Sequence, residues 1–586
     1  MKLQKINIFH QFKQDLTNII KVLLPQSADI NFSIEPPKDQ KHGDISSNAA
    51  MVMVKNIGNT QMLSSKDMAL KIIKEVGELN YIDKVEVAGP GFINITLCKK
   101  TLFANLHQIN QQSEDYLKIN LGKGKKINIE YVSANPTGPM HIGHARCAVY
   151  GDVLASLLEY CGFEVTKEFY VNDYGKQISI LSQTVYYRYQ EIILQTKIPI
   201  TLGLYPGEYI IPLAEKIAEQ YGEKLMHMNY EEYISIIKPL AVEYMLELIK
   251  IDLTNIGISH DVFFHESTLH ETNAIEKIVS QLKDKGSVYL GTLPHPKGIQ
   301  VQEDWSPSEQ LLFNTTKFGD DQDRPLQKTD GSWSYYASDL AYAQNKIARG
   351  FNQAVMVLGA DHIGYVKRLQ AIFSSLSNNC SLTIKICQLV NFMEHGVPIK
   401  MSKRAGTFTS VADVVKEVDK DIIRFIMLTK KNDVGIDFDL LKVKELSKDN
   451  PVFYVQYAYV RCFSLLEKLK TISPKTFAVI ENNVADYSLL ALEKELELIK
   501  KLIFWPKILE SAVINMEPHR IALFLHECVT IFHSLWSSYT SNNEAYRFIV
   551  ENDLDLTAAR ISLAKSITII IEAAFKIMKI TPLTKM

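Results

Sequence analysis

Two histidines, His141 and His144, stand three residues apart at the start of a predicted helix. At this spacing both imidazoles share one face of the first turn, beside backbone N–H groups without intrahelical partners and beside the positive end of the helix dipole. This arrangement favours an anion such as a phosphate, and Gly143 leaves room for it to approach the backbone. The alternatives are an ordinary helix start with two solvent-facing histidines, and a zinc site, which would need a third ligand.

A strand, a tight loop and a helix are expected to position these histidines. Residues from Ile127 onward alternate between apolar and polar types and favour β structure, which predicts a buried strand of about five to seven residues. Asparagine, proline and glycine then mark residues 135–139 as a loop, and apolar residues recur at helical spacing from 141 to 160. The order strand, loop, helix is typical of phosphate-binding sites.

A run of basic residues far along the chain is the second candidate site. Lys400, Lys403 and Arg404 place three cations within five positions, and Gly406 follows them. The run lies between the β-prone apolar segment IKICQLV and the helical segment SVADVVKEV. A mobile basic loop of this kind suits phosphates, whereas a solvated run of surface charge is the alternative.

The two sites together carry a family signature. HIGH at 141–144 and KMSK at 400–403, in this order, resemble the signature of class I aminoacyl-tRNA synthetases. Further segments resemble the arginyl-tRNA synthetase family: EYVSANPTGPMHIGHAR at 130–146, YVNDYGKQ at 170–177, YYASDLAYA at 335–343, GADHIGYV at 359–366 and KMSKRAGTF at 400–408. The N-terminal HGDISSNAAM and AGPGFINITL and the C-terminal DNPVFYVQYAYVR and AARISLAKSI extend the resemblance over essentially the whole chain.

The resemblance implies a two-step reaction, in which arginine attacks the α-phosphate of ATP and the terminal ribose hydroxyl of tRNA then takes the arginyl group. It assigns catalysis to His141, His144, Lys400 and Lys403, with Gly138, Gly143, Met401 and Ser402 completing the ATP contacts. Charge accumulates on phosphate oxygens, so positioning and electrostatics should dominate and no side-chain nucleophile is required. ATP is expected to bring Mg²⁺, without a metal bound by the protein itself. The loop reads KMSKR rather than KMSKS, a variation also seen among arginyl enzymes.

Recognition of arginine needs acceptors that match its planar guanidinium group. By their positions in the family's motifs, Glu130, Tyr335 and Asp339 match guanidinium contacts, and Ser133, Asn135 and His144 match contacts to the amino-acid backbone. Tyr335 and Asp339 stand four residues apart and share a helix face. Outside the motif, Asp339 would be read as a helix cap or a surface acid. His362 is also assigned to arginine, at a position where some family members carry glutamine.

Length and composition set the broad class. The chain has 586 residues, 46% of them hydrophobic and 22% charged, which predicts a soluble protein of about three or four domains. No apolar run reaches the length of a membrane span, and the seven cysteines include no CxxC pair, so we expect a cytoplasmic protein without disulfides. The net charge of -2 does not report local basic patches and leaves nucleic-acid binding open.

Three domains are predicted from the patterns and the resemblance. Residues 1–115 form an N-terminal α+β domain that contacts the tRNA elbow in this family. Residues 116–440 form a Rossmann-like α/β catalytic domain with a parallel sheet, which carries a helical insertion at about 182–265 and the KMSKR loop at 400–404. Residues 441–586 form an all-α anticodon-binding bundle. Strands and helices that alternate from Val288 to Val390 are expected to complete the parallel sheet.

Five residues are candidates for contact with tRNA. Val85 to Leu97 reads as two strands around a turn at 89–91, and the second strand should present Phe92 and Asn94 on one exposed face. A ring and an amide at this spacing can stack on and hydrogen-bond one unpaired base, although core packing of Phe92 is an equal alternative. Tyr454, Tyr457 and Arg461 form an aromatic and basic cluster on a C-terminal helix, where packing in the core is the alternative.

Two rival functions account for the sequence less well than arginyl transfer to tRNA. A nucleotidyltransferase that uses HxGH without tRNA would not account for the N-terminal domain or for the helical C-terminal third. A non-catalytic RNA-binding relative would have no physical need for His141, His144, Lys400 and Lys403. The expected partners are therefore tRNA(Arg), L-arginine and ATP, with no membrane, and we expect a monomer. The family also implies that bound tRNA is needed for activation. Because the acceptors Glu130 and Asp339 could together reject lysine by roughly 10⁴-fold, no editing domain is required.

Overall fold

The computed structural model describes residues 7–24, 30–37, 39–57, 64–112, 114–199, 203–293, 309–328, 330–376, 379–398, 409–447, 449–539 and 547–586. The chain forms two compact units. The central unit comprises residues 121–446 with 517–519, and the terminal unit comprises residues 1–120, 447–516 and 520–586. The predicted basic loop at 400–404 lies outside the described residues.

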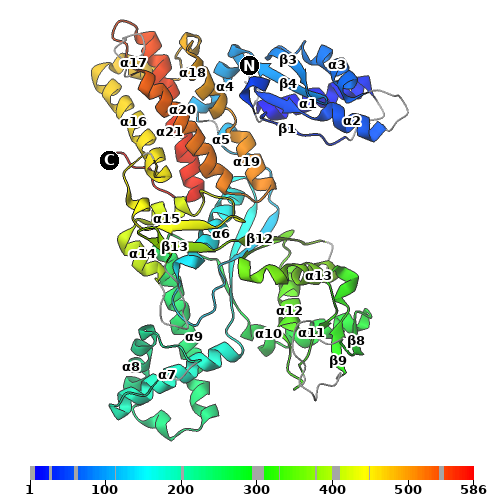
Figure 1. The fold of residues 1–586 in the computed structure, drawn as a ribbon, viewed down its shortest axis with the longest axis vertical. Helices are drawn as coiled ribbons and strands as arrows, with labels where there is room; N and C mark the ends of the chain where they lie inside the picture. Colours follow the sequence, from blue (N-terminus) through cyan, green and yellow to red (C-terminus); the bar gives the residue numbers. More distant parts are fainter. Residues whose placement is uncertain are drawn as a thin grey trace. The chain divides into compact units, whose positions relative to one another are not determined.

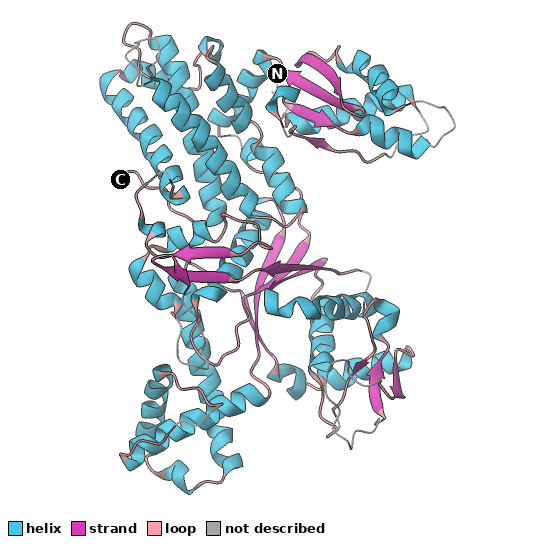
Figure 2. Cartoon of the chain, in the orientation of Figure 1, coloured by secondary structure: helices cyan, strands magenta, loops and turns pink. Residues whose placement is uncertain are grey.

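A five-stranded parallel sheet lies at the heart of the central unit (Figures 1 and 2). Its order is β12-β11-β5-β6-β7, and every neighbouring pair is parallel. The strands are β5 (Lys126–Tyr131), β6 (Glu164–Val171), β7 (Val262–His265), β11 (Gln353–Gly359) and β12 (Ser381–Cys387). The strand order reverses beside β5, and sheets of this kind bind ligands outside the carboxyl ends of the strands at such a point. The predicted α/β fold is confirmed.

Helix α6 (Ile142–Tyr160) follows β5 and is buried along most of its length. Gly151 allows it to pack closely, because a Cβ there would lie 2.2 Å from the ring of Tyr131. The guanidinium of Arg424 donates to Asp152 on α6 at 2.7 Å, and both side chains are fully buried. These contacts fix the helix against the strand. The predicted strand, loop and helix are thus confirmed, with the helix starting one residue after His141.

A helical insertion separates β6 from β7. It contains α7 (Lys176–Leu194), η4 (Glu208–Ile210), α8 (Ile211–Tyr221), η5 (Lys224–His227) and α9 (Tyr230–Asn255). These helices share a core of their own, to which Leu181, Ile210 and Ile237 belong. We expected the insertion to span about 182–265. That limit is wrong at its far end, because β7 pairs in parallel with β6 and is part of the sheet.

Two smaller sheets complete the central unit. The first has the order β10-β9-β8 and is antiparallel. Of the strands expected between Val288 and Val390 to complete the parallel sheet, β11 and β12 do so, whereas β8, β9 and β10 form this separate sheet. The second has the order β14-β13-β15. The elements of this half are α10 (Ser267–Glu271), α11 (Ala274–Asp284), β8 (Val288–Gly291), β9 (Gln310–Phe313), η6 (Thr315–Phe318), β10 (Arg324–Pro325), α12 (Tyr335–Ala348), η7 (Ala360–Tyr365), α13 (Val366–Leu376), β13 (Val390–Glu394), β14 (Val397–Pro398), α14 (Val411–Glu417), α15 (Lys420–Ile426), β15 (Ile436–Asp439) and η9 (Lys442–Lys444).

The N-terminal part of the terminal unit is an antiparallel sheet with helices, in the order β1-β2-β4-β3. Its elements are α1 (Ile8–Leu23), β1 (Ile34–Glu35), η2 (Gln40–His42), β2 (Ile45–Ser47), α2 (Ala49–Ile57), α3 (Ser65–Val76), β3 (Ile82–Ala88), β4 (Phe92–Leu97), α4 (Lys99–Asn110) and α5 (Glu114–Leu117). Strands β3 and β4 are joined by a turn in which Gly89 and Gly91 have positive φ angles of 52° and 124°. The predicted α+β fold with two strands around this turn is confirmed.

The C-terminal part of the terminal unit is helical in the described residues, as predicted. It contains α16 (Pro451–Ile472), α17 (Pro474–Glu481), η10 (Tyr487–Leu489), α18 (Glu493–Leu502), α19 (Trp505–Ile514), α20 (His519–Tyr539) and α21 (Leu554–Met578). A buried ion pair joins Arg560 on α21 to Glu495 on α18 at 3.0 Å. The indole of Trp505 donates to the carbonyl of Leu117 at 3.0 Å, so the helices also pack against α5.

Candidate active site

The backbone after β5 turns sharply before it reaches α6. Val132 and Ser133 have φ angles of 70° and 37°, in a region that residues with a Cβ rarely adopt and that costs about 1 to 3 kcal/mol each. The hydroxyl of Ser133 accepts from the backbone N–H of Tyr170 at 3.0 Å and donates to Glu130 at 3.4 Å. Strand β6 therefore holds this strained turn in place. Such strain is typical of functional sites.

The two predicted histidines meet at the start of α6. Their rings stack with centroids 3.7 Å apart, and the backbone N–H of His141 donates to Nδ1 of His144 at 3.2 Å. Because Nδ1 of His144 accepts, its Nε2 carries a proton in the neutral ring and can donate to an anion. A Cβ at Gly143 would lie 2.8 Å from Nδ1 of His141. The missing side chain therefore makes room for the imidazole, rather than only for a ligand as predicted.

The segment that follows the basic loop is attached to this same helix start. Ser410 forms an isolated antiparallel bridge with His141. The N–H of Ile142 donates to Thr409 at 3.3 Å, and the N–H of Val411 donates to Met140 at 2.9 Å. The catalytic assignments of Lys400 and Lys403, and the ATP contacts of Met401 and Ser402, lie outside the described residues and stay predictions.

Gly138 lies beneath a side chain that the sequence reasoning did not consider. Its backbone is buried, and a Cβ there would lie 2.8 Å from the ring and hydroxyl of Tyr209, which belongs to the helical insertion. The hydroxyl of Tyr209 donates to the carbonyl of Thr137 at 2.8 Å. Tyr209 thus fills the space over Gly138. The backbone of Gly138 is therefore not open to ATP on this side, although an open backbone had been expected.

Glu130 belongs to a buried network of charges under the sheet's carboxyl edge. The ammonium of Lys346 lies 3.0 Å from a carboxylate oxygen of Glu130 and 3.0 Å from one of Glu168. Tyr342 donates to both carboxylates, and Arg349 pairs with Glu168. Burial alone would raise the pKa of Glu168, but Lys346, Tyr342 and Arg349 together lower it. The two carboxylates are matched by two cations.

Glu266 and Asp339 form a second acidic pair. Lys238 attracts Glu266 from a distance, but neither carboxylate forms an ion pair in the described part of the chain. Burial, reinforced by neighbouring negative charges, raises the pKa of Glu266 to about 7 and that of Asp339 to about 8. Ser338 and Tyr170 hydrogen-bond Glu266, and Arg368 attracts Asp339 without cancelling the shift. Two acids held against their ionised state mark a place where a cationic ligand would be bound strongly.

Glu266 was missed by the sequence analysis, although a signal was present. It directly follows β7, and the strained turn at Val132 follows β5; these two strands flank β6 in the sheet, and polar residues at the carboxyl ends of parallel strands converge at one edge. We had assigned residues up to 265 to an insertion, which concealed the strand. Asp339 lies one turn into α12 as predicted, and the charges of Glu130 and Glu266 both raise its pKa.

The other residues predicted to bind the arginine substrate are more exposed to solvent. Tyr335 is 56% exposed at the start of α12, and a Cβ at Gly175 would lie 3.5 Å from its hydroxyl. Asn135 is exposed on the loop before α6. His362 is exposed in η7, where its Nε2 lies 3.5 Å from Asp361. The structure thus brings Glu130, Ser133 and Asp339 together, whereas His362 contacts its neighbours Asp361 and Tyr365 in η7.

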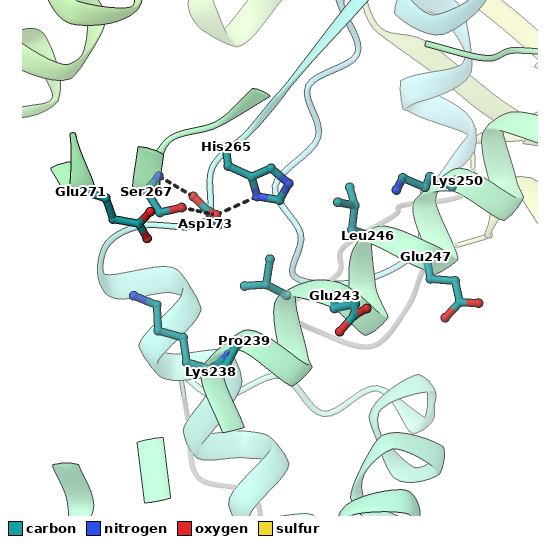
Figure 3. A pocket seen from close by; sticks show the side chains of 11 residues that line it. Asp173, Lys238, Pro239, Glu243, Leu246, Glu247, Lys250, His265, Ser267 and Glu271 are labelled. Atoms are coloured by element: carbon teal, nitrogen blue, oxygen red, sulfur yellow. Dashed lines mark hydrogen bonds and ion pairs between the residues drawn. The ribbon is translucent and has the colours of Figure 1, made fainter. Parts of the chain in front are cut away.

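A cavity of about 750 Å³ lies between α9 and the carboxyl ends of β6 and β7 (Figure 3). Asp173 is at its edge, where one carboxylate oxygen lies 2.8 Å from Nδ1 of His265 and accepts from the Ser267 hydroxyl at 2.8 Å. The opposite wall is formed by α9, which contributes two lysines and two glutamates, Lys238, Lys250, Glu243 and Glu247. Asp173 also contributes to the raised pKa of Glu266, so the cavity adjoins the acidic pair.

The predicted tRNA residues of the N-terminal sheet differ in exposure. Phe92 is 39% exposed, but Asn94 is only 6% exposed. Asn94 lies in β4, which has β2 on one side and β3 on the other, so it is inside the sheet rather than on an exposed strand. The expectation that both side chains share an exposed face is therefore wrong for Asn94.

The predicted cluster on α16 is held together by its own contacts. The guanidinium of Arg461 lies 4.1 Å from the ring centre of Tyr457 and 4.8 Å from that of Trp536, and it donates to the Tyr457 hydroxyl at 2.8 Å. Tyr454 packs against His533 with centroids 4.3 Å apart. All three predicted residues are half-buried, so each keeps a surface that a base could contact.

The described residues contain neither a cluster of metal ligands nor a membrane-spanning helix. No group of three or more histidine, cysteine, aspartate or glutamate side chains there is arranged to hold a metal ion. No helix in that part of the chain is long and apolar enough to cross a membrane.

Three family models match the chain in succession. Residues 8–97 match the arginyl tRNA synthetase N terminal domain, residues 105–447 match the catalytic domain of the class I (R) tRNA synthetases, and residues 455–586 match the DALR anticodon binding domain. These models cover the N-terminal sheet, the central unit and the C-terminal helices.

Complete proteins match as well. The chain is 50% identical to an arginine–tRNA ligase of Rickettsia rickettsii and 51% identical to one of Rickettsia bellii, in each case over 99% of this chain and 100% of the relative. The arginyl-tRNA synthetase structure from Thermus thermophilus has the same fold, with a TM-score of 0.72 at 16% identity over 99% of this chain and 100% of that one. The chain therefore belongs to the arginyl-tRNA synthetase family, and its function is the ligation of arginine to tRNA.

Proposed function

We propose that the chain performs this ligation in two steps at the carboxyl edge of the parallel sheet. In the first, a carboxylate oxygen of L-arginine attacks the α-phosphorus of ATP, and diphosphate leaves. In the second, the 3′-terminal ribose hydroxyl of tRNA(Arg) attacks the carbonyl carbon of arginyl-adenylate, and AMP leaves. The observation that carries the proposal is the acidic pair Glu266 and Asp339, which forms no ion pair with a cation in the described part of the chain and whose pKa values stay raised despite Lys238 and Arg368.

The phosphates are proposed to lie at the start of α6. Nε2 of His144 and the first backbone N–H groups of the helix would donate to them, with the helix dipole adding to the attraction. The attachment of residues 409–411 to this helix start supports a role for Lys400 and Lys403 at the same phosphates, because the chain leaves the basic loop there. Gly143 supports the site indirectly, by making room for the ring of His141.

The guanidinium of arginine is proposed to pair with Asp339 and Glu266, with Tyr335 covering it. A carboxylate aligned with two guanidinium N–H groups forms a bidentate pair that a lysine ammonium cannot reproduce. Ser133, Asn135 and His144 are proposed to contact the amino and carboxylate groups of the substrate. Glu130 would act through charge and position, because Lys346 already pairs with it. A role for His362 in arginine binding stays part of the proposal.

Mg²⁺ is proposed to enter with ATP. Mg²⁺ prefers oxygen ligands, and the first turn of α6 contains no acidic residue, so the nucleotide's own phosphate oxygens would hold the ion rather than this part of the protein. When bound, Mg²⁺ would neutralise phosphate charge. His144 and the helix N–H groups would orient the same phosphates.

The terminal unit is proposed to bind tRNA(Arg). Phe92 is exposed enough to stack on an unpaired base of the elbow. Tyr454, Tyr457 and Arg461 are the proposed contacts of the anticodon-binding helices. The proposed domain limits are 1–115, 116–440 and 441–586. We also propose a cytoplasmic monomer that requires tRNA for arginine activation.

The decisive experiment measures ATP- and tRNA-dependent attachment of labelled amino acids, with all twenty offered in competition. Arginine alone should become attached. His144→Ala and Lys403→Ala should each lower kcat by roughly ten- to a thousandfold, about 1.4 to 4 kcal/mol, while leaving arginine binding largely intact. An unchanged kcat would remove the residue concerned from the mechanism. Diphosphate exchange should stay near background until tRNA is added.

A further inference from the structure

The loop between β5 and α6 is held by two side chains of the helical insertion. The hydroxyl of Tyr209, in η4, donates to the carbonyl of Thr137 at 2.8 Å. A carboxylate oxygen of Asp252, near the end of α9, accepts from the backbone N–H of Met140 at 2.7 Å. These partners lie 72 and 112 residues from the loop in sequence, so the contacts are tertiary and not part of a local turn.

Both contacts are closely fitted. The Tyr209 ring packs on Gly138 and also against Gly207, where a Cβ would lie 2.0 Å from the ring. Any side chain at either glycine would displace the tyrosine. Asp252 is only 3% exposed, and a buried carboxylate is tolerated when its oxygens accept hydrogen bonds. The carbonyl of Met140 accepts in turn from Val411 at 2.9 Å, so both polar backbone atoms of Met140 are engaged.

The loop needs such outside support. Pro139, between the two anchored residues, has no N–H to donate, and the preceding backbone at Val132 and Ser133 is strained. Met140 directly precedes His141, so its position sets where the two imidazoles stand. A displacement of about 1 Å at a reacting group can cost on the order of a hundredfold in rate.

We propose that Tyr209 and Asp252 are positioning residues, which hold the loop 137–140 so that the start of α6 meets the phosphates of ATP. This role rests on the proposed function. It gives the helical insertion a task in the first chemical step, in addition to any contact with tRNA. Removing either anchor should therefore affect turnover and leave the arginine pocket, with Glu266 and Asp339, largely unaltered.

The test compares Tyr209→Phe with Tyr189→Phe in the full-length enzyme with purified tRNA(Arg). Phenylalanine keeps the ring on Gly138 and removes only the hydroxyl. Tyr189 is the matched control, because it is also in the insertion and donates to a backbone carbonyl, that of Gly222, away from the loop. Tyr209→Phe should lower kcat roughly tenfold and change the KM for arginine by less than about twofold, whereas Tyr189→Phe should keep the parent kcat.

Asp252 provides a second, independent measurement. Asp252→Asn keeps an oxygen that can accept from Met140, so it should retain most of the parent kcat, whereas Asp252→Ala should lose at least as much as Tyr209→Phe. Equal loss in both Asp252 variants, or a Tyr209→Phe enzyme that matches Tyr189→Phe, would overturn the proposal. If Asp252→Ala does not fold, Tyr209→Phe decides. A parent chain without arginylation would instead overturn the proposed function.

Discussion

Two pairs of carboxylates in the central unit have opposite electrostatic surroundings; three of the four are buried and Asp339 is half-buried. Glu130 and Glu168 are bonded to Lys346, and Glu168 also pairs with Arg349, so the charges balance and the pKa of Glu168 is lowered. Asp339 in the second pair lies close enough to this network for the charge of Glu130 to raise its pKa. Burial and the charge of Asp173 raise the pKa of Glu266 to about 7, and burial with the charges of Glu266 and Glu130 raises that of Asp339 to about 8.

The difference suits the first pair to a structural role and the second pair to the proposed binding of substrate. A balanced buried network specifies how β5, β6 and α12 pack, and it leaves no charge for a ligand. An unbalanced pair stores an electrostatic cost in the free protein, which a cation relieves when it binds. The arginine guanidinium is the cation that the reaction provides. The comparison can be tested by removing a charge from each pair in turn.

The largest effect is expected from Lys346→Met, which leaves Glu130 and Glu168 without the cation that they share. Breaking a buried ion pair by removing one partner costs about 3 to 5 kcal/mol of unfolding free energy. Urea unfolding measures this loss. Lys444→Met is the control, because its pair with Glu417 is exposed and should contribute less than about 1 kcal/mol. Equal losses in the two variants would show that the Glu130 network is not structural.

Asp339→Asn should weaken arginine binding without destabilising the protein, in contrast to Lys346→Met. Burial and neighbouring negative charges make the ionised form of Asp339 unfavourable in the free protein. The substitution removes this carboxylate, so the unfolding free energy should stay the same or rise. The KM for arginine should increase by roughly 10- to 100-fold, about 1.5 to 3 kcal/mol, because a charged hydrogen bond to the guanidinium is lost. The ratio of kcat/KM for arginine to that for lysine should decrease. Asp284→Asn, at an exposed position on α11, is the control. A variant that discriminates as well as the parent removes Asp339 from the pocket.

The smallest expected effect is a dependence of arginine binding on pH. Acids with raised pKa values hold protons near pH 6.5, and binding of the guanidinium requires their release, so the KM for arginine should fall about tenfold between pH 6.5 and 8.5. The same raised pKa values affect the stability of the free protein in the opposite direction. Its unfolding free energy should decline as pH rises from about 4 through 8, because the folded state binds more protons than the unfolded state.

Asp339→Asn serves as the comparison for this pH dependence. Its KM profile should be flatter than that of the parent, since one of the two titrating acids is gone. A parallel profile in parent and variant would assign the pH effect to another group, and the contrast between the two carboxylate pairs would then lose its functional meaning.

Local patterns predicted the start of the site well. Alternation in β5, the breakers at 135–139 and the helical spacing of α6 depend on residues close in sequence, and each element formed where expected. The glycines were harder to interpret. Gly138 and Gly143 were expected to admit a ligand, but they accommodate Tyr209 and His141, because what fills the space beside a glycine is decided by neighbours that its own sequence does not show.

The sequence by itself determined the family, the strand, loop and helix around His141, and the helical character of the C-terminal part, because motifs and periodicity are local properties of the chain. Only the tertiary structure showed that β7 belongs to the sheet and that Glu266 consequently joins Asp339. It also decided that Lys346 neutralises Glu130 and Glu168, and not this second pair. The state of a buried acid depends on the distance to charges contributed by other elements, and that distance exists only after the chain has folded.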